Sequence, residues 1–228
     1  MPIYQLPEEP LFPNPEMAET DGLLAVGGDL SPERLLNAYS QGIFPWYSEG
    51  QPILWWSPNP RMLLFPKDFK RSKNLRRTVQ SDKFQIKFDS NFEDVIDHCS
   101  KISRKGQPGT WITKEMKNAY ISLHQLGFAH SVETYLDEKL VGGLYGISLG
   151  GAFFGESMFH LVSDASKVAL WNLVDRTLEW NYDFIDVQQD TDHLRSLGAV
   201  SIERKKFLIL LSESLKKKTR KGNWGIGK

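Results

Sequence analysis

The sequence has a single cysteine, no long apolar run and no net charge. One cysteine, Cys99, excludes a disulfide framework within the chain and any metal or iron–sulfur site built from several thiolates. The longest run of aliphatic and aromatic side chains, 207–211, has five residues, whereas a membrane-spanning helix needs roughly 20. The amino terminus is acidic and proline-rich, unlike a secretory signal. We therefore expect a cytoplasmic protein that does not associate with membranes.

The chain also lacks the glycine-rich loops that bind nucleotide phosphates and the His-Glu-x-x-His pattern of zinc proteases. We accordingly expect neither a metal nor a cofactor. Apolar residues make up 40% of the 228 residues and charged residues 25%, which are ordinary values for a globular protein and exclude wholesale disorder. This length allows one large domain or two small ones.

The balance of 28 basic and 28 acidic side chains hides four alternating blocks of charge. Residues 1–60 contain one basic and eight acidic side chains, and residues 61–87 contain nine basic and two acidic. Residues 88–203 contain nine basic and seventeen acidic side chains, and the block from 204 onward contains nine basic and one acidic. Such blocks indicate a polyanion at one surface and a cationic partner at another, unless they are only solvated faces.

Ten of the twelve prolines lie in residues 1–60, which predicts an irregular N-terminal module with one helix capped by Ser31. From about residue 84 the pattern alternates between strands and helices. Strands are expected over 84–88, 130–136, 140–149, 152–155 and 184–188, and helices over 91–100, 113–126, 165–180 and 206–215. The fold class is therefore mixed α+β, with a small N-terminal domain over residues 1–63 and a larger sheet domain over residues 64–228.

Polar groups occur within two apolar segments. Glu156 lies in segment 153–159, where a carboxylate among Phe and Met side chains must be paired or held ready for chemistry, unless it faces water at a strand end. Asp186 and Gln188 project from one face of the predicted strand 184–188, since side chains alternate along a strand. An acid and an amide on one face suit the orientation of a hydrogen-bonding substrate, although the solvent face of an edge strand would look the same.

Aromatic residues beside proline turns, in segments 42–46 and 55–61, predict either a preformed stacking pocket or the core of the small module. Together these segments resemble the leucyl/phenylalanyl-tRNA–protein transferases. The resemblance runs through most of the chain, in the segments 22–32, 42–46, 55–61, 109–113, 141–146, 155–159, 165–167, 186–188 and 196–199. The colinear series makes the resemblance specific, which no single segment would. Val187 departs from the family pattern, in which cysteine is common between the aspartate and the glutamine.

The resemblance implies a reaction: transfer of leucine, phenylalanine or methionine from aminoacyl-tRNA to an N-terminal arginine or lysine of an acceptor protein. The product is then marked for degradation through the N-degron pathway. The implied fold is a small N-terminal α/β domain followed by a domain similar to the Gcn5-type acetyltransferases. The Gln/Arg-x-x-Gly-x-Gly/Ala loop with which those enzymes bind coenzyme A is absent, which favours a tRNA ester as the donor. We expect a monomer.

The resemblance also assigns roles to residues. Asp186 and Gln188 correspond to the family's proposed catalytic pair, with the aspartate polarising the amide, and Glu156 corresponds to a carboxylate that holds substrate at the reaction centre. The substrate-binding residues correspond to Trp46, Trp111, Phe153, Gly155, Ser157 and Met158. Phosphate contacts to the tRNA are expected from the basic cluster of Lys73, Arg76, Arg77 and Lys83.

Aminolysis of an ester needs a neutral amine, and an α-amino group with a pKa of roughly 7.7–8.0 is about 10–17% neutral at pH 7. A strong base is therefore unnecessary, and we expect the weakly basic amide oxygen of Gln188 to orient the amine. The 2′-hydroxyl of the tRNA is an alternative carrier of the proton. A coenzyme A-dependent acyltransferase and an RNA-binding module are alternative functions, of which the second leaves Glu156 and the pair Asp186 and Gln188 without a role.

Overall fold

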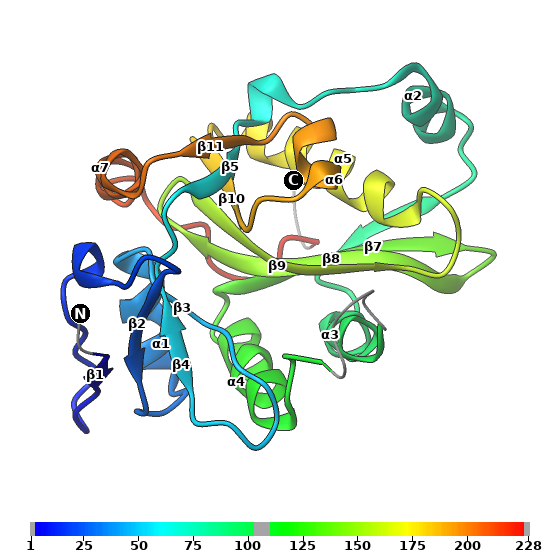
Figure 1. The fold of residues 1–228 in the computed structure, drawn as a ribbon. Coiled ribbons are helices and arrows are strands. Elements are labelled where there is room, and N and C mark those ends of the chain that lie inside the picture. Colours follow the sequence, from blue (N-terminus) through cyan, green and yellow to red (C-terminus); the bar gives the residue numbers. More distant parts are fainter. Residues whose placement is uncertain (1–2, 103–109, 226–228) are drawn as a thin grey trace.

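A computed structural model describes residues 3–102 and 110–225 of the chain. The helices and strands form two sheets with helices packed around them, so the predicted mixed α+β class is confirmed (Figure 1). Gly109, which begins one of the segments that carry the family resemblance, lies outside the described residues. Within the described ranges, no helix combines the length and apolar character needed to cross a bilayer.

The N-terminal sheet has four short strands in the order β1-β2-β4-β3. They are β1 (Tyr4–Gln5), β2 (Leu23–Val26), β3 (Phe44–Pro45) and β4 (Leu54–Trp56). A 3₁₀ turn, η1 (Pro15–Met17), precedes β2, and helix α1 (Pro32–Ser40) connects β2 to β3. As the sequence predicts, α1 begins after Ser31, whose hydroxyl accepts a hydrogen bond from the backbone N–H of Arg34.

The larger sheet has seven strands in the order β11-β5-β10-β9-β8-β7-β6. They are β5 (Arg61–Leu64), β6 (Gln85–Phe88), β7 (Ala129–Leu136), β8 (Lys139–Leu149), β9 (Ala152–His160), β10 (Phe184–Gln188) and β11 (Val200–Ile202). Strands β7, β8 and β9 form an antiparallel meander. Strand β5 follows the N-terminal sheet directly and lies between β10 and β11. The expected domain boundary, between residues 63 and 64, falls inside β5.

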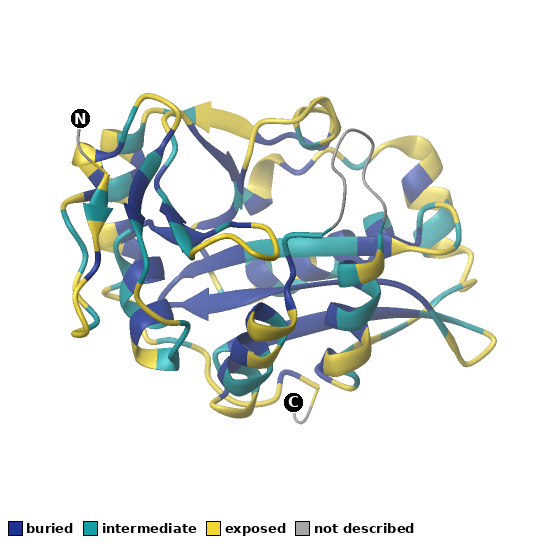
Figure 2. Ribbon diagram, turned by 60° about the horizontal axis from the view of Figure 1, so that its bottom comes forward, coloured by how far each residue is buried: buried dark blue, intermediate teal, exposed yellow. Residues whose placement is uncertain are grey.

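Helices cover both faces of the larger sheet, so most of its strand residues are buried (Figure 2). Helix α5 (Ala165–Glu179) packs on one face together with α2 (Lys73–Gln80). Helices α3 (Phe92–Lys101) and α4 (Lys114–Gln125) pack on the other face, where α1 joins them (Figure 1). The remaining helices are η2 (Pro66–Asp68), α6 (Asp192–Ser196) and α7 (Arg204–Ser214).

Strand β9 is longer than the sequence predicts, because a bulge interrupts its alternation. The predicted strand ends at residue 155, whereas β9 continues to His160. Gly146 of β8 pairs with Gly155 and Tyr145 pairs with Ser157, so Glu156 is the extra residue of a β-bulge. Only glycine fits at position 146, since a Cβ there would lie 2.1 Å from the carbonyl oxygen of Phe154. After the bulge, the residues that face the two sides of the sheet exchange places. The sequence therefore lacks the regular alternation of side chains that would identify the whole strand.

Strands β9 and β10 are parallel neighbours over three residue pairs only. Phe184 pairs with Ala152, Ile185 with Phe153 and Asp186 with Phe154. Beyond these pairs β9 continues, while β10 keeps pairing with β5 on its other side through Gln188. The two strands therefore separate just where the bulge places Glu156, and they leave an opening within the sheet.

Candidate functional site

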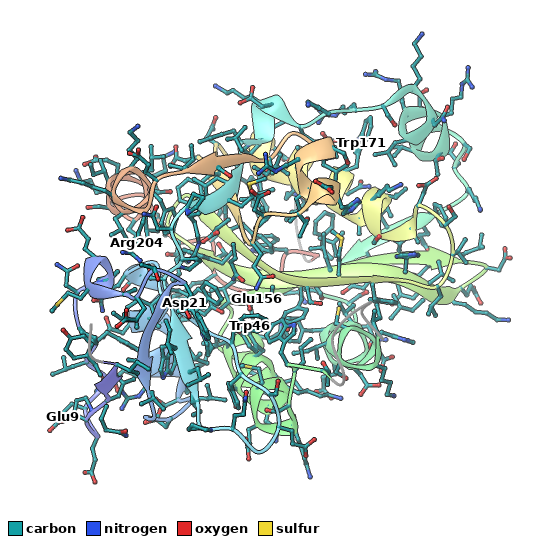
Figure 3. All side chains as sticks on the ribbon, in the orientation of Figure 1. Glu9, Asp21, Trp46, Glu156, Trp171 and Arg204 are labelled. Atoms are coloured by element: carbon teal, nitrogen blue, oxygen red, sulfur yellow. The ribbon has the colours of Figure 1, made fainter. Side chains whose placement is uncertain are left out.

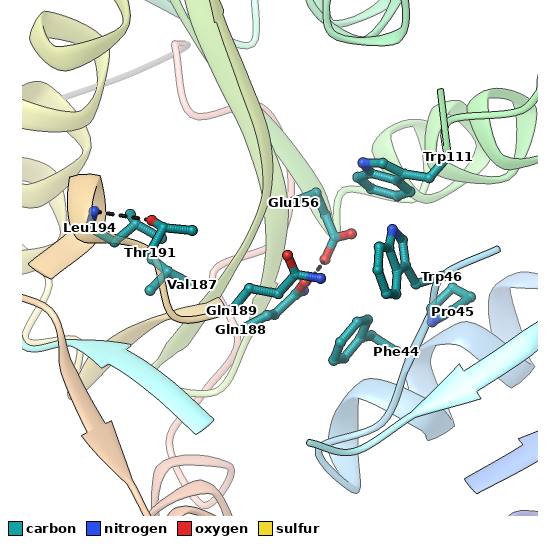
Figure 4. Close-up of a pocket in the computed structure, with 10 residues that line it drawn as sticks. All are labelled: Phe44, Pro45, Trp46, Trp111, Glu156, Val187, Gln188, Gln189, Thr191 and Leu194. Carbon is teal, nitrogen blue, oxygen red and sulfur yellow. Dashed lines mark hydrogen bonds between the residues drawn. The ribbon is translucent and has the colours of Figure 1, made fainter. Parts of the chain in front are cut away.

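Two cavities meet at Glu156, where β9 and β10 separate. The larger cavity, of about 430 Å³, extends toward α5 and is mainly apolar. Its lining includes Leu144, Phe153, Gly155, Ser157, Met158, Leu170, Leu173 and Ile185. The smaller cavity, of about 130 Å³, is bounded by Phe44, Pro45, Trp46, Trp111 and Gln188 (Figure 4). Both cavities are also lined by Glu156, Val187, Gln189, Thr191 and Leu194.

The carboxylate of Glu156 accepts three hydrogen bonds from three different parts of the chain. The hydroxyl of Tyr39, from α1, donates to Oε1 at 2.8 Å, and the hydroxyl of Tyr120, from α4, donates to Oε2 at 2.9 Å. The side-chain amide of Gln188, at the end of β10, donates to Oε1 at 2.8 Å (Figure 4). Glu156 is thus held in one orientation between the two cavities.

Burial raises the pKa of Glu156 to about 7, although the hydrogen bonds from Tyr39, Tyr120 and Gln188 lower it. The nearby charge of Asp186 acts in the same direction as burial. Burial and the charge of Glu156 also raise the pKa of Tyr39 and the pKa of Tyr120, so both hydroxyls stay protonated and donate. A carboxyl with a pKa near 7 can accept or release a proton at neutral pH.

Asp186 is fully buried and forms an ion pair with the equally buried Arg61 of β5. The Arg61 guanidinium donates through Nε to Oδ1 at 2.9 Å and through Nη2 to Oδ2 at 2.7 Å. The same Oδ1 accepts the backbone N–H of Gln188 at 2.9 Å, and Gln188 has a left-handed φ of 62°. Asp186 thus holds the backbone of Gln188. The resemblance expects Asp186 to polarise the side-chain amide of Gln188, but that amide is oriented by Glu156.

The structure brings Glu156, Gln188 and Asp186 together but divides the expected substrate-binding residues between two cavities. Phe153, Gly155, Ser157 and Met158 line the larger cavity. Trp46 and Trp111 line the smaller one and lie beside Glu156 (Figure 4). Figure 3 also shows Trp46 close to Glu156. The two tryptophans therefore face a different space from Phe153 and Met158.

Sequence reasoning misses three side chains that hold the site. Tyr39 and Tyr120 lie on helices, where a tyrosine is ordinarily read as part of the core, and only the fold directs both hydroxyls to Glu156. Arg61 is counted in the sequence among a block of basic residues, and its partner lies 125 positions away. The sequence signal for Arg61 is its place at the end of segment 55–61, one of the segments that carry the family resemblance.

The basic cluster occupies a separate surface. Lys73, Arg76 and Arg77 are exposed on α2, and Lys83 is exposed just after it. Figure 1 places α2 beyond α5 and well apart from the N-terminal sheet. Within residues 3–102 and 110–225, the structure contains no group of three or more His, Cys, Asp and Glu side chains placed to hold a metal ion.

Two family models match the chain. The model for the N-terminal domain of leucyl/phenylalanyl-tRNA protein transferase matches residues 28–59, and the model for leucyl/phenylalanyl-tRNA protein transferase matches residues 63–224. The chain is 52% identical over 229 residues to the leucyl/phenylalanyl-tRNA–protein transferase of Myxococcus xanthus, covering 100% of this chain and 98% of that one. It is 55% identical to that of Legionella pneumophila, covering 94% and 96%.

Solved structures show a weaker likeness. A functionally unknown conserved protein from Staphylococcus epidermidis matches with 10% identity and a TM-score of 0.44, covering 79% of this chain and 68% of that one. A GCN5-related N-acetyltransferase from Kribbella flavida matches with 11% identity and a TM-score of 0.36, covering 75% and 61%.

We predict that the Glu156 carboxyl titrates near pH 7, which ¹³C NMR of carboxyl resonances can measure with Glu156→Gln as the assignment control. An exposed glutamate has a pKa of roughly 4.3, so the charged form of Glu156 weakens the folded state. Its ionisation should cost stability as the pH rises from about 4.3 to about 7. The stability of Glu156→Gln relative to the unmodified chain should therefore rise through that window. A titration midpoint near 4.5 with a constant stability difference would contradict this.

Proposed function

We propose that this chain, which belongs to the leucyl/phenylalanyl-tRNA–protein transferase family and is an aminoacyl-tRNA-dependent transferase, moves leucine, phenylalanine or methionine to an N-terminal arginine or lysine. The observation that carries the proposal is the position of Glu156, held by three hydrogen bonds where an apolar and an aromatic cavity meet. The modified acceptor would then enter the N-degron pathway in the cytoplasm, with the enzyme acting as a monomer.

The larger cavity would hold the side chain of the donor amino acid. Its volume of about 430 Å³ lies within the range of roughly 300–1,000 Å³ that is typical of ligand pockets. Phe153, Leu170 and Ile185 offer apolar contact, and Met158 adapts its shape to leucine, phenylalanine or methionine. Such a cavity separates similar apolar side chains by only about 1–3 kcal/mol, which is consistent with the use of more than one amino acid.

The smaller cavity would hold the terminal adenosine of the tRNA. Trp46 and Trp111 present aromatic rings there, and aromatic rings are the usual platforms for unstacked bases. With the amino acid on one side of Glu156 and the adenosine on the other, the ester between them lies beside Glu156 and Gln188. In this arrangement the amino acid and the adenosine would both contact residues that the resemblance assigns to substrate binding.

Transfer requires the acceptor nitrogen to attack the ester carbonyl carbon, which forms the peptide bond and breaks the bond to the ribose oxygen. Because the amide nitrogen of Gln188 donates to Glu156, the amide oxygen points away from the carboxylate and can accept a hydrogen bond from the incoming amine. The buried pair of Asp186 and Arg61 fixes Gln188 in this position. Orientation of the amine then provides most of the catalytic effect.

The proton lost by the nitrogen must reach the leaving ribose oxygen. Glu156, with a pKa of about 7, can take it from the amine and return it to the oxygen. The terminal 2′-hydroxyl of the tRNA offers a second route, in which it carries the same proton from the nitrogen to the leaving oxygen. Both routes leave Gln188 as an orienting group, since an amide oxygen is too weak a base to deprotonate an ammonium group.

The cluster of Lys73, Arg76, Arg77 and Lys83 would contact phosphates in the body of the tRNA, apart from the reacting end. Such contacts are largely independent of sequence, so a single enzyme can use several tRNA species. An RNA-binding module without catalysis is the wrong alternative, because the chain belongs to a family of transferases. No observation on the described residues favours coenzyme A as the donor.

We predict that Gln188→Ala lowers kcat for leucine transfer by about 10²–10³-fold, the usual effect of removing one oriented hydrogen-bonding group at a reaction centre. The assay uses radiolabelled leucyl-tRNA and an acceptor protein that starts with arginine, with the same protein starting with alanine as the acceptor control. Binding of the tRNA should be unchanged, and Gln51→Ala, in an exposed loop, should behave as the unmodified chain. Full activity of Gln188→Ala would show that this residue does not belong to the reaction centre. If the unmodified chain transferred leucine to neither acceptor, the proposed function would be refuted.

We predict that the double substitution Arg76→Ala and Arg77→Ala weakens tRNA binding and reduces the slope of log Kd against log salt concentration by about two. The matched control is Lys205→Ala with Lys206→Ala, which removes two exposed charges from α7. Filter binding between 50 and about 200 mM salt measures both slopes. An equal change in the two variants, or none in either, would show that α2 does not contact the tRNA.

A further inference from the structure

The residues that line both cavities mark the junction between them. They are Glu156, Val187, Gln189, Thr191 and Leu194. With the amino-acid side chain in the larger cavity and the adenine in the smaller one, the ribose that joins them would pass through this junction. The ribose carries a 2′-hydroxyl next to the esterified 3′-oxygen, so this hydroxyl would enter the junction together with the ester.

A hydroxyl that leaves water needs a hydrogen-bond partner, and most side chains at the junction are apolar or engaged. Val187 and Leu194 are apolar, and the Glu156 carboxylate already accepts three hydrogen bonds. The Thr191 hydroxyl accepts the backbone N–H of Leu194 at 3.2 Å and thereby caps α6. Gln189 is exposed, and its side-chain amide forms no hydrogen bond within the part of the chain that the structure describes. Gln189 is therefore the free polar side chain at the junction.

The backbone of Gln189 is fixed, although its side chain is free. Its N–H donates to the carbonyl oxygen of Val187 at 2.7 Å, which closes a three-residue turn around Gln188. Gln188 has its left-handed φ of 62° in this turn, and its own N–H donates to the buried carboxylate of Asp186. The side chain of Gln189 thus extends from an anchored turn beside Gln188 (Figure 4).

An amide side chain suits a ribose hydroxyl as a partner. The amide has both a donor and an acceptor, and a hydroxyl also has both, so the two groups can pair in either direction. The 2′-hydroxyl is also the group by which a protein distinguishes RNA from DNA at a given site. A contact with Gln189 would therefore contribute to the choice of an RNA donor as well as to its orientation.

We propose that the side-chain amide of Gln189 forms a hydrogen bond with the 2′-hydroxyl of the terminal ribose of the donor tRNA. This contact holds the hydroxyl beside the 3′-oxygen that leaves during transfer. The inference rests on the proposed function, because the ribose belongs to the donor of that reaction. It gives a substrate-binding role to a residue that follows the pair Asp186 and Gln188 and that lies outside the segments that carry the family resemblance.

The test compares two donors, in which leucine is esterified to the 3′-oxygen of adenosine or of 2′-deoxyadenosine. For each enzyme variant, the ratio of kcat/KM for the adenosine donor to kcat/KM for the deoxyadenosine donor measures the benefit of the 2′-hydroxyl. Gln189→Ala should lower this ratio about fivefold, as expected for losing one hydrogen bond between uncharged groups. Gln125→Ala, at the exposed end of α4, is the matched control and should keep the ratio unchanged.

The KM for the acceptor protein separates a donor contact from an acceptor contact. Gln189→Ala should leave this KM unchanged, and its melting temperature should not fall because the side chain is exposed. A higher KM for the acceptor with an unchanged donor ratio would show that Gln189 contacts the acceptor, which overturns the proposal. An unchanged ratio with an unchanged KM would overturn it too, while transfer by the unmodified enzyme stays intact. Transfer from neither donor by the unmodified enzyme would instead refute the proposed function itself.

Discussion

The buried ion pair between Arg61 and Asp186 is the contact on which the site depends. Both side chains are inaccessible to solvent, and Arg61 also donates to the carbonyl oxygen of Gly42 at 3.1 Å and lies over the Phe44 ring. The pair thus connects the loop after α1 to the centre of the larger sheet and holds the backbone N–H of Gln188. Removing one partner of such a buried pair costs roughly 3–5 kcal/mol, because the other charge is left uncompensated.

The opening in the sheet follows from two local features that act together. The bulge at Glu156 turns its side chain toward Tyr39 and Tyr120, and the separation of β9 from β10 leaves space on both sides of it. A flat, fully paired sheet would have no room for a substrate between its central strands. The site is therefore built by the interruption of regular pairing, and the helices on both faces supply the groups that line it.

The sequence predicts the elements whose patterns are local. The predicted bounds of α5, β7 and β8 differ from the observed ones by at most one residue, and the unusual setting of Glu156 and of Gln188 points to the site. Helix α2 is missed because only two of its eight residues, Leu75 and Val79, are apolar, which is too few to show a stripe in the sequence. The insertion of β5 between β10 and β11, and the pairing of Arg61 with Asp186, depend on contacts across more than 120 residues, which no local pattern contains.

We propose that the ester of the donor lies at Glu156, between an apolar and an aromatic cavity. A crystal structure with a stable amide analogue of phenylalanyl-adenosine tests it most directly. We expect a phenylalanine ring between Phe153 and Met158, an adenine beside Trp46 and Trp111, and a carbonyl group next to Glu156 and Gln188. A phenylalanine ring bound outside the larger cavity, with the carbonyl group remote from Glu156, would contradict it.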